Sequence, residues 1–340
     1  MVEKMYWTGL SPDEARKVLA NKDKSKNNKK MALREAVDKF VKDGDNVGIG
    51  GFVNGRQPVA IVHEIVRQKL KDLTLSFQSS GLAVEYFAGG MVLSEEKKLI
   101  KRLELAYWAH EAFGISPLFR YLAENGMVEM EDWSNYNMSA RFKAGAMGLP
   151  FIPTRSPLGS DIPGNNRGKV IDCPFTGKPV ILLPASYPNV AIIHVQEADI
   201  YGNCRIQGPL YTCPEIAMAS TYTIVTCERI IEHQDMVKYS NRVSIPFFAV
   251  DAVCEVPMGG YPGNVHGCYY FDEKHIVEFR SSCEDFRKED GKGLQEYYRK
   301  FVFDVEDTED FISQIPYQQL KHIQKIEPGH RLDSVYPSMD

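Results

Sequence analysis

The sequence has little of what marks secreted, membrane-spanning or nucleic-acid-binding proteins. Its seven cysteines include no Cys-x-x-Cys pair, and their odd number and scatter are typical of free thiols in a reducing compartment. The N-terminus lacks the basic-then-apolar order of a signal peptide, and no apolar run approaches the length of a membrane span. The net charge of −5 is spread along the chain rather than gathered into a basic surface. We therefore expect a cytoplasmic protein that binds neither nucleic acid nor membrane.

Several ligand-binding motifs are absent as well. There is no Gly-x-Gly-x-x-Gly, no Gly-x-x-x-x-Gly-Lys-[Ser/Thr] and no Gly-x-Ser-x-Gly, which argues against a dinucleotide fold, a P-loop and a serine-hydrolase elbow. His194, His233, His266 and His275 lack partners at the spacing of a ligand set, so we predict no metal site. His194 lies in an apolar run and is predicted to be a core histidine with its own hydrogen-bond partners.

What is present is a long alternation of helices and short apolar strands. The 340 residues, 44% hydrophobic and 25% charged, suffice for a large core. Such alternation implies βαβ crossovers, so we predict an α/β fold with a mainly parallel sheet and helices on both faces. The predicted strands are 46–50, 73–77, 102–108, 128–131, 180–183, 190–195, 222–227 and 247–256. The predicted helices are 11–20, 32–41, 58–69, 82–88, 117–124, 138–147, 215–219, 294–302 and 308–314.

Two segments fall outside this alternation. Residues 1–30 form an N-terminal extension whose Lys- and Asn-rich end, 21–30, is predicted to be a solvated linker, and residues 31–340 form the main domain. Residues 151–177 are rich in Pro, Gly, Asn and Asp and have neither helical nor strand periodicity. We therefore predict a long loop there, placed to cover a site.

The most informative segment is the corner at Gly50-Gly51-Phe52, between a buried strand and a helix opened by Pro58. Adjacent glycines permit positive φ and bring bare N–H groups toward a ligand. Free N–H groups at the start of the following helix favour an anion, and Arg56 could clamp a carboxylate through two hydrogen bonds. The alternative is an ordinary strand-to-helix turn with Arg56 on the surface.

Two further corners, Gln78-Ser79-Ser80-Gly81 and His110-Glu111-Ala112-Phe113-Gly114, follow the next two strands. Ligands of open α/β sheets bind beyond the carboxyl ends of the strands, so three polar corners together predict a site. The two serines could donate to an acyl or carboxylate oxygen, or cap a helix, and His110 with Glu111 could do acid–base work, or have a cap or surface role. The predicted substrate-binding residues are Gly50, Gly51, Phe52, Asn54, Arg56, Ser79, Ser80, Gly81, His110 and Glu111.

The order of these residues resembles the first signature of family I CoA-transferases: Asp43-Gly44, an apolar stretch, Gly50-Gly51-Phe52 and then Pro58. Arg56, where other branches have glycine, resembles the A (alpha) subunit of the glutaconate CoA-transferase branch. The resemblance covers most of the chain and implies the CoA-transferase fold, with a CoA thioester as substrate and no permanently bound cofactor. Further matches to that branch occur in family order at 147–153, 190–194, 198–203, 222–228 and 250–253.

The resemblance also implies a covalent mechanism that needs a second polypeptide. Family I enzymes attack an acyl-CoA with a glutamate, form a mixed anhydride and then a glutamyl-CoA thioester, and pass CoA to an incoming acid. That glutamate belongs to the B subunit, in a Ser-Glu-Asn-Gly segment. We therefore predict no catalytic residue in this chain, and a heterodimer or higher α/β oligomer with the CoA-transferase B subunit. Ala123-Glu124-Asn125-Gly126 imitates that segment without its serine, and we predict that Glu124 lies at the end of a helix.

The resemblance leaves the acyl group and the reaction open. Residues 1–30, 94–98 and 155–171 depart from the glutaconate pattern, so the substrate is predicted only as a dicarboxylic or bulky acyl group. Relatives in the branch decarboxylate an acyl-CoA or open carbocyclic rings of CoA thioesters by hydrolysis, and in those the B-subunit glutamate is replaced. A non-enzymatic acyl-CoA-binding protein is a third alternative.

Overall fold

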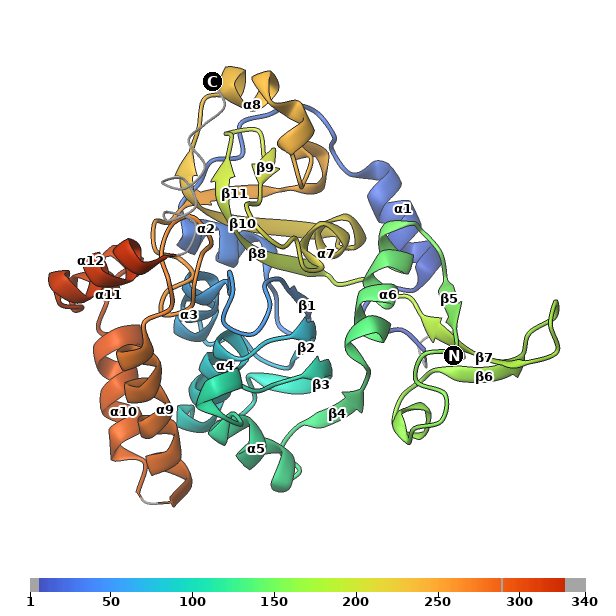
Figure 1. The fold of residues 1–340 in the computed structure, drawn as a ribbon, viewed down its shortest axis with the longest axis horizontal. Coiled ribbons are helices and arrows are strands. Elements are labelled where there is room, and N and C mark those ends of the chain that lie inside the picture. The colour runs from blue at the N-terminus through green and yellow to red at the C-terminus, as the bar shows by residue number, and fades with distance from the viewer. Residues whose placement is uncertain (1–5, 289, 328–340) are drawn as a thin grey trace.

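A central, mainly parallel β-sheet organises the chain (Figure 1). The computed structural model describes residues 6–288 and 290–327. The strands of the main sheet are β1 (Asn46–Ile49), β2 (Leu73–Ser79), β3 (Ile100–Tyr107), β4 (Glu129–Asp132), β8 (Val190–Ala198), β9 (Cys204–Arg205), β10 (Tyr222–Ile230) and β11 (Ala252–Glu255). Their order is β11-β10-β8-β1-β2-β3-β4, with β9 antiparallel to β8 and every other pairing parallel.

The main sheet is buried on both faces. Along β8, Val190 and Ile192 pack into one hydrophobic core, whereas Ala191 and Ile193 pack into another. All residues of β8 are buried. Because side chains alternate across a pleated strand, a strand between two helical layers must be largely apolar on both sides. The predicted α/β fold with helices on both faces is confirmed.

Helices cover both faces of the sheet (Figure 1). The α-helices are α1 (Pro12–Asn21), α2 (Leu33–Phe40), α3 (Val59–Arg67), α4 (Leu82–Leu93), α5 (Pro117–Glu124), α6 (Asn135–Ala146), α7 (Cys213–Ala219), α8 (His233–Lys238), α9 (Glu273–Lys288), α10 (Lys292–Tyr298), α11 (Thr308–Ser313) and α12 (Tyr317–Ile326). The short helical turns are η2 (Glu111–Phe113), η3 (Ile162–Gly164), η4 (Ser240–Arg242), η5 (Phe247–Ala249) and the π-helical η6 (Arg299–Phe303). Helices α2 to α5 share one core with α9 to α12, and α6 and α7 pack into the other.

Residues 151–177 do not form the predicted loop. They contain β5 (Phe151–Thr154) and β6 (Lys169–Asp172), which pair antiparallel with β7 (Pro179–Pro184) in the order β5-β7-β6. We call residues 151–184 the arm. Its edge strands are half exposed and β5 contains a proline, which an edge strand tolerates, so no apolar run marks them in the sequence. The β6 and β7 end of the arm projects from the body of the molecule (Figure 1), whereas Ile181 and Leu183 pack into the second hydrophobic core.

The Lys-rich run 21–30 is not simply a solvated linker. The Lys22 ammonium lies 2.6 Å from the Asp251 carboxylate, and both side chains are mostly buried. Lys30 forms a parallel bridge with Val253 of β11. The end of the extension is therefore fixed to one edge of the sheet, because a buried charge needs a partner of opposite sign.

The remaining differences concern element boundaries. The strand predicted over 247–256 begins only at Ala252, since η5 precedes it and the Asp251 carboxylate accepts the Thr223 amide at 2.8 Å. The helix predicted over 294–302 divides into α10 and η6. The sequence patterns did not predict β9, α8, α9 and α12.

Two findings concern the cysteines and the lengths of the helices. All seven cysteines fall within the described ranges and are free thiols, as predicted. No helix of residues 6–288 and 290–327 is long and apolar enough to cross a membrane.

Candidate functional site

The three predicted corners lie together at the carboxyl edge of the sheet, and most of their predicted substrate-binding residues are buried. They follow β1, β2 and β3, which are parallel neighbours. The Val53 amide donates to the Ser79 carbonyl at 3.2 Å, the Gly81 amide donates to the Val53 carbonyl at 3.3 Å, and the Ser80 amide donates to the Tyr107 carbonyl at 3.2 Å. The chain runs outward from β1 to β2 on one side and later returns as β8 on the other, so the first corner lies at the topological switch point of the sheet, where ligands of such folds bind.

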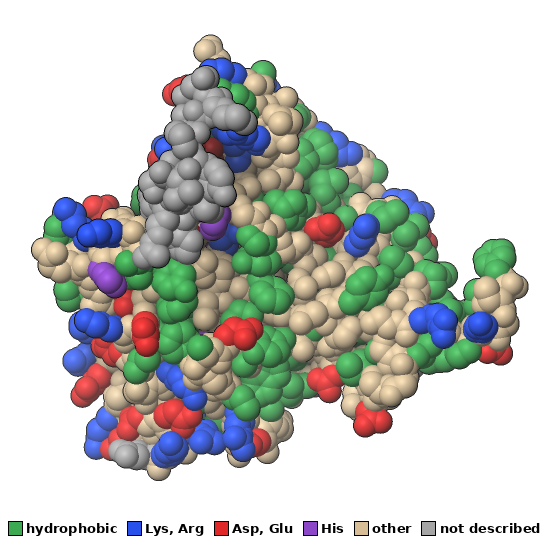
Figure 2. All heavy atoms as spheres, viewed as in Figure 1, with side chains coloured by type: hydrophobic (Ala, Val, Ile, Leu, Met, Phe, Trp, Pro, Cys, Tyr) green, Lys and Arg blue, Asp and Glu red, His purple; other side chains and the backbone are tan. Residues whose placement is uncertain are grey.

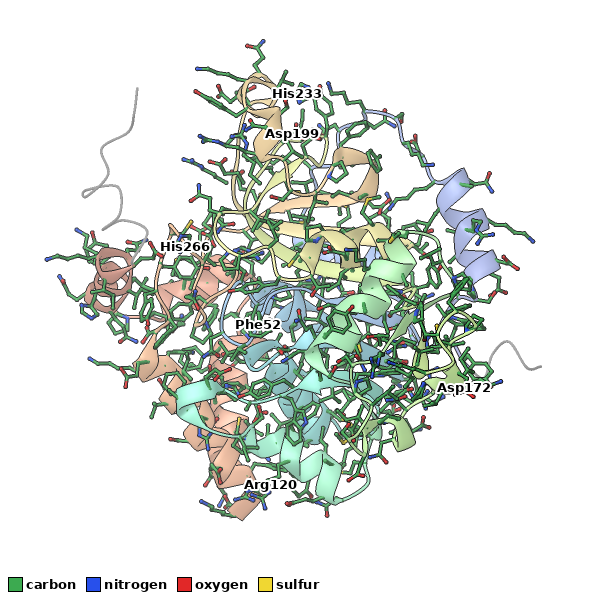
Figure 3. The ribbon with its side chains drawn as sticks, turned by 45° about the vertical axis from the view of Figure 1, so that its right-hand side comes forward. Phe52, Arg120, Asp172, Asp199, His233 and His266 are labelled. Atoms are coloured by element: carbon green, nitrogen blue, oxygen red, sulfur yellow. The ribbon has the colours of Figure 1, made fainter. Side chains whose placement is uncertain are left out.

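The first corner is a tight and strained turn. Gly51 has φ +83, and a Cβ there would lie 2.6 Å from the Arg56 carbonyl oxygen, so only glycine fits. Val53 and Arg56 also have left-handed φ values, of +50 and +48. Left-handed backbone is costly for a β-branched residue and persists only where the surrounding structure holds it, most often at functional sites. Figure 3 shows Phe52, from this turn, near the centre of the molecule.

Arg56 is buried, so the interpretation of it as a surface residue is wrong. Its side chain donates to the carbonyls of His194 at 3.3 Å and Pro209 at 2.6 Å, and lies 3.6 Å from the Cys213 thiol. The guanidinium also lies 4.9 Å from the centre of the Tyr211 ring. Arg56 thereby holds the 209–213 segment against the corner, and its role as a carboxylate clamp stays a prediction.

The serines of the second corner donate to side-chain amides. The Ser79 hydroxyl donates to Asn135 Oδ1 and the Ser80 hydroxyl to Gln57 Oε1, each at 2.6 Å. Helix α4 has Gly81 as its N-cap without a side-chain cap, so the capping interpretation of these serines is wrong.

Buried amide groups without partners lie beside these serines. Asn54 Oδ1, Gln57 Nε2 and both amide atoms of Asn137 have no hydrogen-bond partner among the described residues. Because a buried polar group without a partner is costly, amides left in this state at a strained corner favour an additional group that completes their bonds.

In the third corner, His110 is buried whereas Glu111 is exposed. His110 is 1% exposed, and neither ring nitrogen has a partner within the described part of the chain. Burial, together with the nearby Arg280 guanidinium, lowers the pKa of His110 to about 3, so the imidazole is neutral near neutrality. Glu111 is exposed and has φ +52. A neutral imidazole can donate or accept a hydrogen bond but does not supply a cation.

The helix after the first corner is less open to an anion than the sequence suggests. Pro58 is the N-cap of α3, and the Ala60 amide donates to the Gly259 carbonyl at 3.0 Å. A loop from another part of the chain therefore takes one of the free N–H groups predicted there.

Two segments that the sequence patterns did not predict line the first corner. Tyr211 stacks on Phe52 with ring centres 5.3 Å apart. In the second segment, 257–264, the Asn264 amide donates to the Asn54 carbonyl and the Asn264 carbonyl accepts from the Arg56 amide, both at 2.8 Å. The glycine- and proline-rich sequence of 257–264, directly after an apolar strand, was a signal for a further corner.

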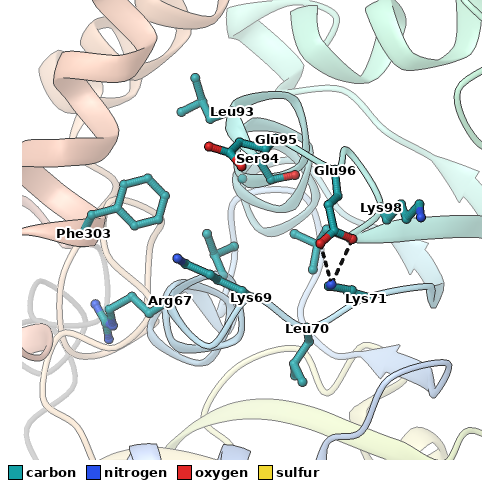
Figure 4. A pocket seen from close by; sticks show the side chains of 13 residues that line it. Arg67, Lys69, Leu70, Lys71, Leu93, Ser94, Glu95, Glu96, Lys98 and Phe303 are labelled. Carbon is teal, nitrogen blue, oxygen red and sulfur yellow. Dashed lines mark hydrogen bonds and ion pairs between the residues drawn. The ribbon is translucent and has the colours of Figure 1, made fainter.

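A cavity of about 730 Å³ lies at the opposite edge of the sheet (Figure 4). The loops before β2 and β3 line it, together with Phe303, and Lys71 and Glu96 form an ion pair of 2.8 Å across it. The corners follow the other ends of the same strands, about 20 Å away at 3.3 Å per residue. This cavity is therefore not part of the candidate site.

In the face seen in Figure 2, hydrophobic and other uncharged atoms predominate in the middle, with a few charged side chains among them, and charged side chains are densest over the C-terminal helices. Across the described ranges, no three His, Cys, Asp or Glu side chains are grouped as metal ligands. The predicted core histidine His194 is confirmed: it is fully buried, with its ring nitrogens 2.9 Å from Thr226 Oγ1 and 2.8 Å from Glu228 Oε1.

Comparisons with known proteins show the family of this chain. The family model for coenzyme A transferase matches residues 30–256. Over 325 residues the chain is 32% identical to the A subunit of glutaconate CoA-transferase from Acidaminococcus fermentans, covering 88% of this chain and 96% of that relative. Over 273 residues it is 36% identical to the A subunit of 3-oxoadipate CoA-transferase from Pseudomonas knackmussii, covering 79% and 93%.

Solved structures give the same result. The crystal structure of glutaconate CoA-transferase from Acidaminococcus fermentans superposes with a TM-score of 0.81 at 30% identity, covering 87% of this chain and 95% of that chain. A variant of the decarboxylase AibA/AibB superposes with a TM-score of 0.70 at 28% identity, covering 80% and 99%. This chain therefore belongs to the coenzyme A transferase family. Its named transferase relatives are A subunits, and it shares their fold.

Proposed function

We propose that this chain is the A subunit of a heteromeric CoA-transferase that moves CoA between carboxylic acids, with a dicarboxylic or bulky acyl group as substrate. The observation that carries the proposal is the placement of the three corners side by side at the switch point of the sheet, with unpartnered buried amide atoms at Asn54 and Gln57 among the described residues. The CoA thioester is a substrate, and no cofactor stays bound. A cytoplasmic location is part of the proposal, and the free cysteines support it.

The nucleophile comes from the partner. The carboxylate of Glu228 already accepts from the Met258 amide and the Tyr269 hydroxyl and contacts His194, and Glu111 is exposed at a turn. A glutamate carboxylate from the B subunit attacks the thioester carbonyl and expels the CoA thiolate, which leaves an acyl-glutamyl anhydride. The thiolate then attacks the glutamyl carbonyl of the anhydride and expels the acyl group as a carboxylate, which gives glutamyl-CoA, and the incoming acid reverses these steps, so that no step is strongly uphill. The amide and hydroxyl groups of the corners hold the acyl group while charge develops on its carbonyl oxygen.

Three exposed apolar side chains support a partner at this surface. Ile115, Tyr136 and Leu210 are 54%, 57% and 44% exposed. Each is next to or within a segment that forms the candidate site. Exposed apolar groups around a polar site are typical of a protein–protein interface.

A second candidate reaction is hydrolysis or decarboxylation of an acyl-CoA on the same scaffold. The similarity to a decarboxylase of this fold supports it. The residue that stands in the partner's Ser-Glu-Asn-Gly position separates the two reactions, since only transfer needs a glutamate there. The third alternative, a non-enzymatic acyl-CoA-binding protein, requires an isolated homo-oligomer that binds without turnover.

The test is to co-express the chain with the neighbouring B-subunit reading frame and incubate the complex with acetyl-CoA and glutarate. Glutaryl-CoA that forms only when acetyl-CoA and glutarate are both present supports CoA transfer. Release of free CoA without an acceptor indicates hydrolysis, and CO₂ release from glutaconyl-CoA indicates decarboxylation. Binding of the acyl-CoA without any of these products would favour the non-enzymatic alternative.

A further inference from the structure

One loop packs against the first corner, and the C-terminal end of this loop is hydrogen-bonded directly to the corner. We define the wall loop as residues 257–264. Asn264 exchanges backbone hydrogen bonds with Asn54 and Arg56 of the corner. A Cβ on Gly263 would lie 2.3 Å from the Asn54 carbonyl oxygen, so the two backbones touch without room for a side chain.

The N-terminal half of the wall loop is held by the side chains of Glu228 and Tyr269. The Met258 amide donates to Glu228 Oε2 at 2.9 Å. The Gly260 amide donates to the Tyr269 hydroxyl oxygen at 3.1 Å, and that hydroxyl donates to Glu228 Oε1 at 2.8 Å. The Tyr269 hydroxyl therefore bridges the loop and the carboxylate, with its donor and an acceptor position both used.

Glu228 is itself fixed to the strand beside the corner. His194 Nε2 lies 2.8 Å from Glu228 Oε1, and the His194 carbonyl accepts from the Arg56 side chain at 3.3 Å. His194 is 0% exposed and Tyr269 is 1% exposed. A continuous set of hydrogen bonds thus runs from the wall loop through Tyr269, Glu228 and His194 to Arg56 in the corner. In a water-excluded setting such bonds hold backbone atoms within narrow limits.

We propose that Tyr269 and Glu228 are positioning residues that hold the wall loop, and with it the Asn54 and Arg56 backbone, in the geometry that the acyl group requires. Neither is a catalytic residue. The proposal rests on the proposed function of the corners as the acyl site. Val53, Arg56 and Met258 have left-handed φ values, so the backbone is strained both in the corner and in the wall loop. Strained backbone persists only where surrounding interactions hold it, and the hydrogen bonds of Tyr269 and Glu228 are such interactions.

The test compares Tyr269→Phe with Tyr270→Phe in the co-expressed complex. Both variants lose one hydroxyl, but the Tyr270 hydroxyl has no hydrogen-bond partner among the described residues. We expect Tyr269→Phe to lower kcat for acyl transfer by between about tenfold and a hundredfold with a smaller change in KM, since misplacement of a site by a fraction of an ångström acts mainly on the transition state. Tyr270→Phe should stay within about twofold of wild type.

Amide hydrogen exchange gives a readout that does not depend on turnover. Exchange at Gly260 should accelerate in Tyr269→Phe and not in Tyr270→Phe, while exchange in the core strand β8 stays unchanged in both. Equal kinetics in the two variants, unchanged exchange at Gly260, or a kcat loss that only follows a lower folded fraction would overturn the proposal. A wild-type complex that binds glutaryl-CoA without any reaction would overturn the proposed function instead, and Gly260 exchange would still decide whether Tyr269 holds the loop.

Discussion

At the scale of single residues, Glu85 is a carboxylic acid enclosed in the core. It lies in the first turn of α4, is 0% exposed, and accepts the Leu118 amide at 2.9 Å through one oxygen. The other oxygen, Oε2, has no hydrogen-bond partner in the described part of the chain. Burial raises the pKa of Glu85 from 4.5 to about 7, although the Leu118 amide opposes this. The acid is therefore largely protonated below neutrality.

Glu85 should make the stability of the chain fall as the pH rises. The folded state binds the proton more tightly than the unfolded chain, so the contribution is complete below about pH 4.5 and is lost as the pH rises through about 7, up to about 3 kcal/mol in total. Glu85→Gln cannot ionise, so its melting temperature relative to wild type should rise between about pH 5 and pH 8. Thermal melts across this range measure it, with the exposed Glu111→Gln as control. Parallel curves for wild type and Glu85→Gln would contradict the assignment.

Arg56 has a predicted role in substrate choice besides the contacts that the structure gives it. If its guanidinium pairs the distal carboxylate of the substrate, Arg56→Ala should raise KM far more for glutarate than for butyrate, because only glutarate loses a charge-assisted bond. Steady-state kinetics with both acids measure the difference. Equal changes for the two acids would discard the clamp, and Arg56 would then serve only to hold the 209–213 segment.

At the scale of elements, the end of α5 explains the sequence that imitates a catalytic segment. Glu124 is the last residue of α5, Asn125 is the C-cap, and Gly126 has φ +60. This is the helix stop that the sequence predicts. The Glu124 carboxylate pairs with Arg120 at 2.5 Å, and both side chains are about half exposed. Figure 3 shows Arg120 far from Phe52.

Glu124→Ala should therefore leave turnover within a few-fold of wild type, because the substitution removes one exposed ion pair worth about 0.5 kcal/mol. Turnover of the co-expressed complex measures this, and Arg120→Ala should give the same small effect. Complete loss of activity in Glu124→Ala alone would mean that the glutamate takes part in catalysis.

A strand or helix could be predicted where its own residues show the apolar pattern or the end signals of that element. The buried strand β8 opens with a continuous apolar run, and α5 carries a proline at its start and Asn-Gly at its end. The long helix α9 escaped prediction because its buried face consists of His275, Ile276, Phe279 and Cys283 within an otherwise charged sequence. The strands β5 and β6 of the arm were not predicted, because they are stabilised by pairing with β7 and their own sequences show no strand pattern.

At the scale of the whole molecule, the sequence located the three corners but not their walls. The corners follow strands that can be read from the sequence, and parallel strands bring their carboxyl ends together. The wall loop and the Tyr211 segment reach the corner from about 150 to 210 residues further along the chain, through contacts that need the completed fold. For the same reason, the burial of Arg56 could not be inferred locally.

The assembly provides a further prediction. A stable heteromer with the B subunit should form, and Ile115→Lys should weaken it by about tenfold or more, because a charge would enter an apolar interface. Val237→Lys is the matched control, because the Val237 side chain is 56% exposed, close to the 54% of Ile115. Val237 lies on α8, at the opposite end of the molecule from α5, the helix that follows Ile115 (Figure 1). Co-purification and size-exclusion chromatography measure the effect. Separate chains that remain inactive when mixed would count against a heteromer.

The bridge between the extension and β11 also concerns association between molecules. β11 is the last strand on its side of the sheet, and a bare edge of this kind is a template on which strands of other molecules pair. The Met31 amide donates to the Val253 carbonyl at 3.1 Å, and the Val253 amide donates to the Lys29 carbonyl at 2.9 Å. These bonds occupy backbone groups that would otherwise recruit another chain. We therefore expect a shortened protein that starts after residue 31 to aggregate even where its own fold is intact, because the segment 29–31 would no longer cover this edge.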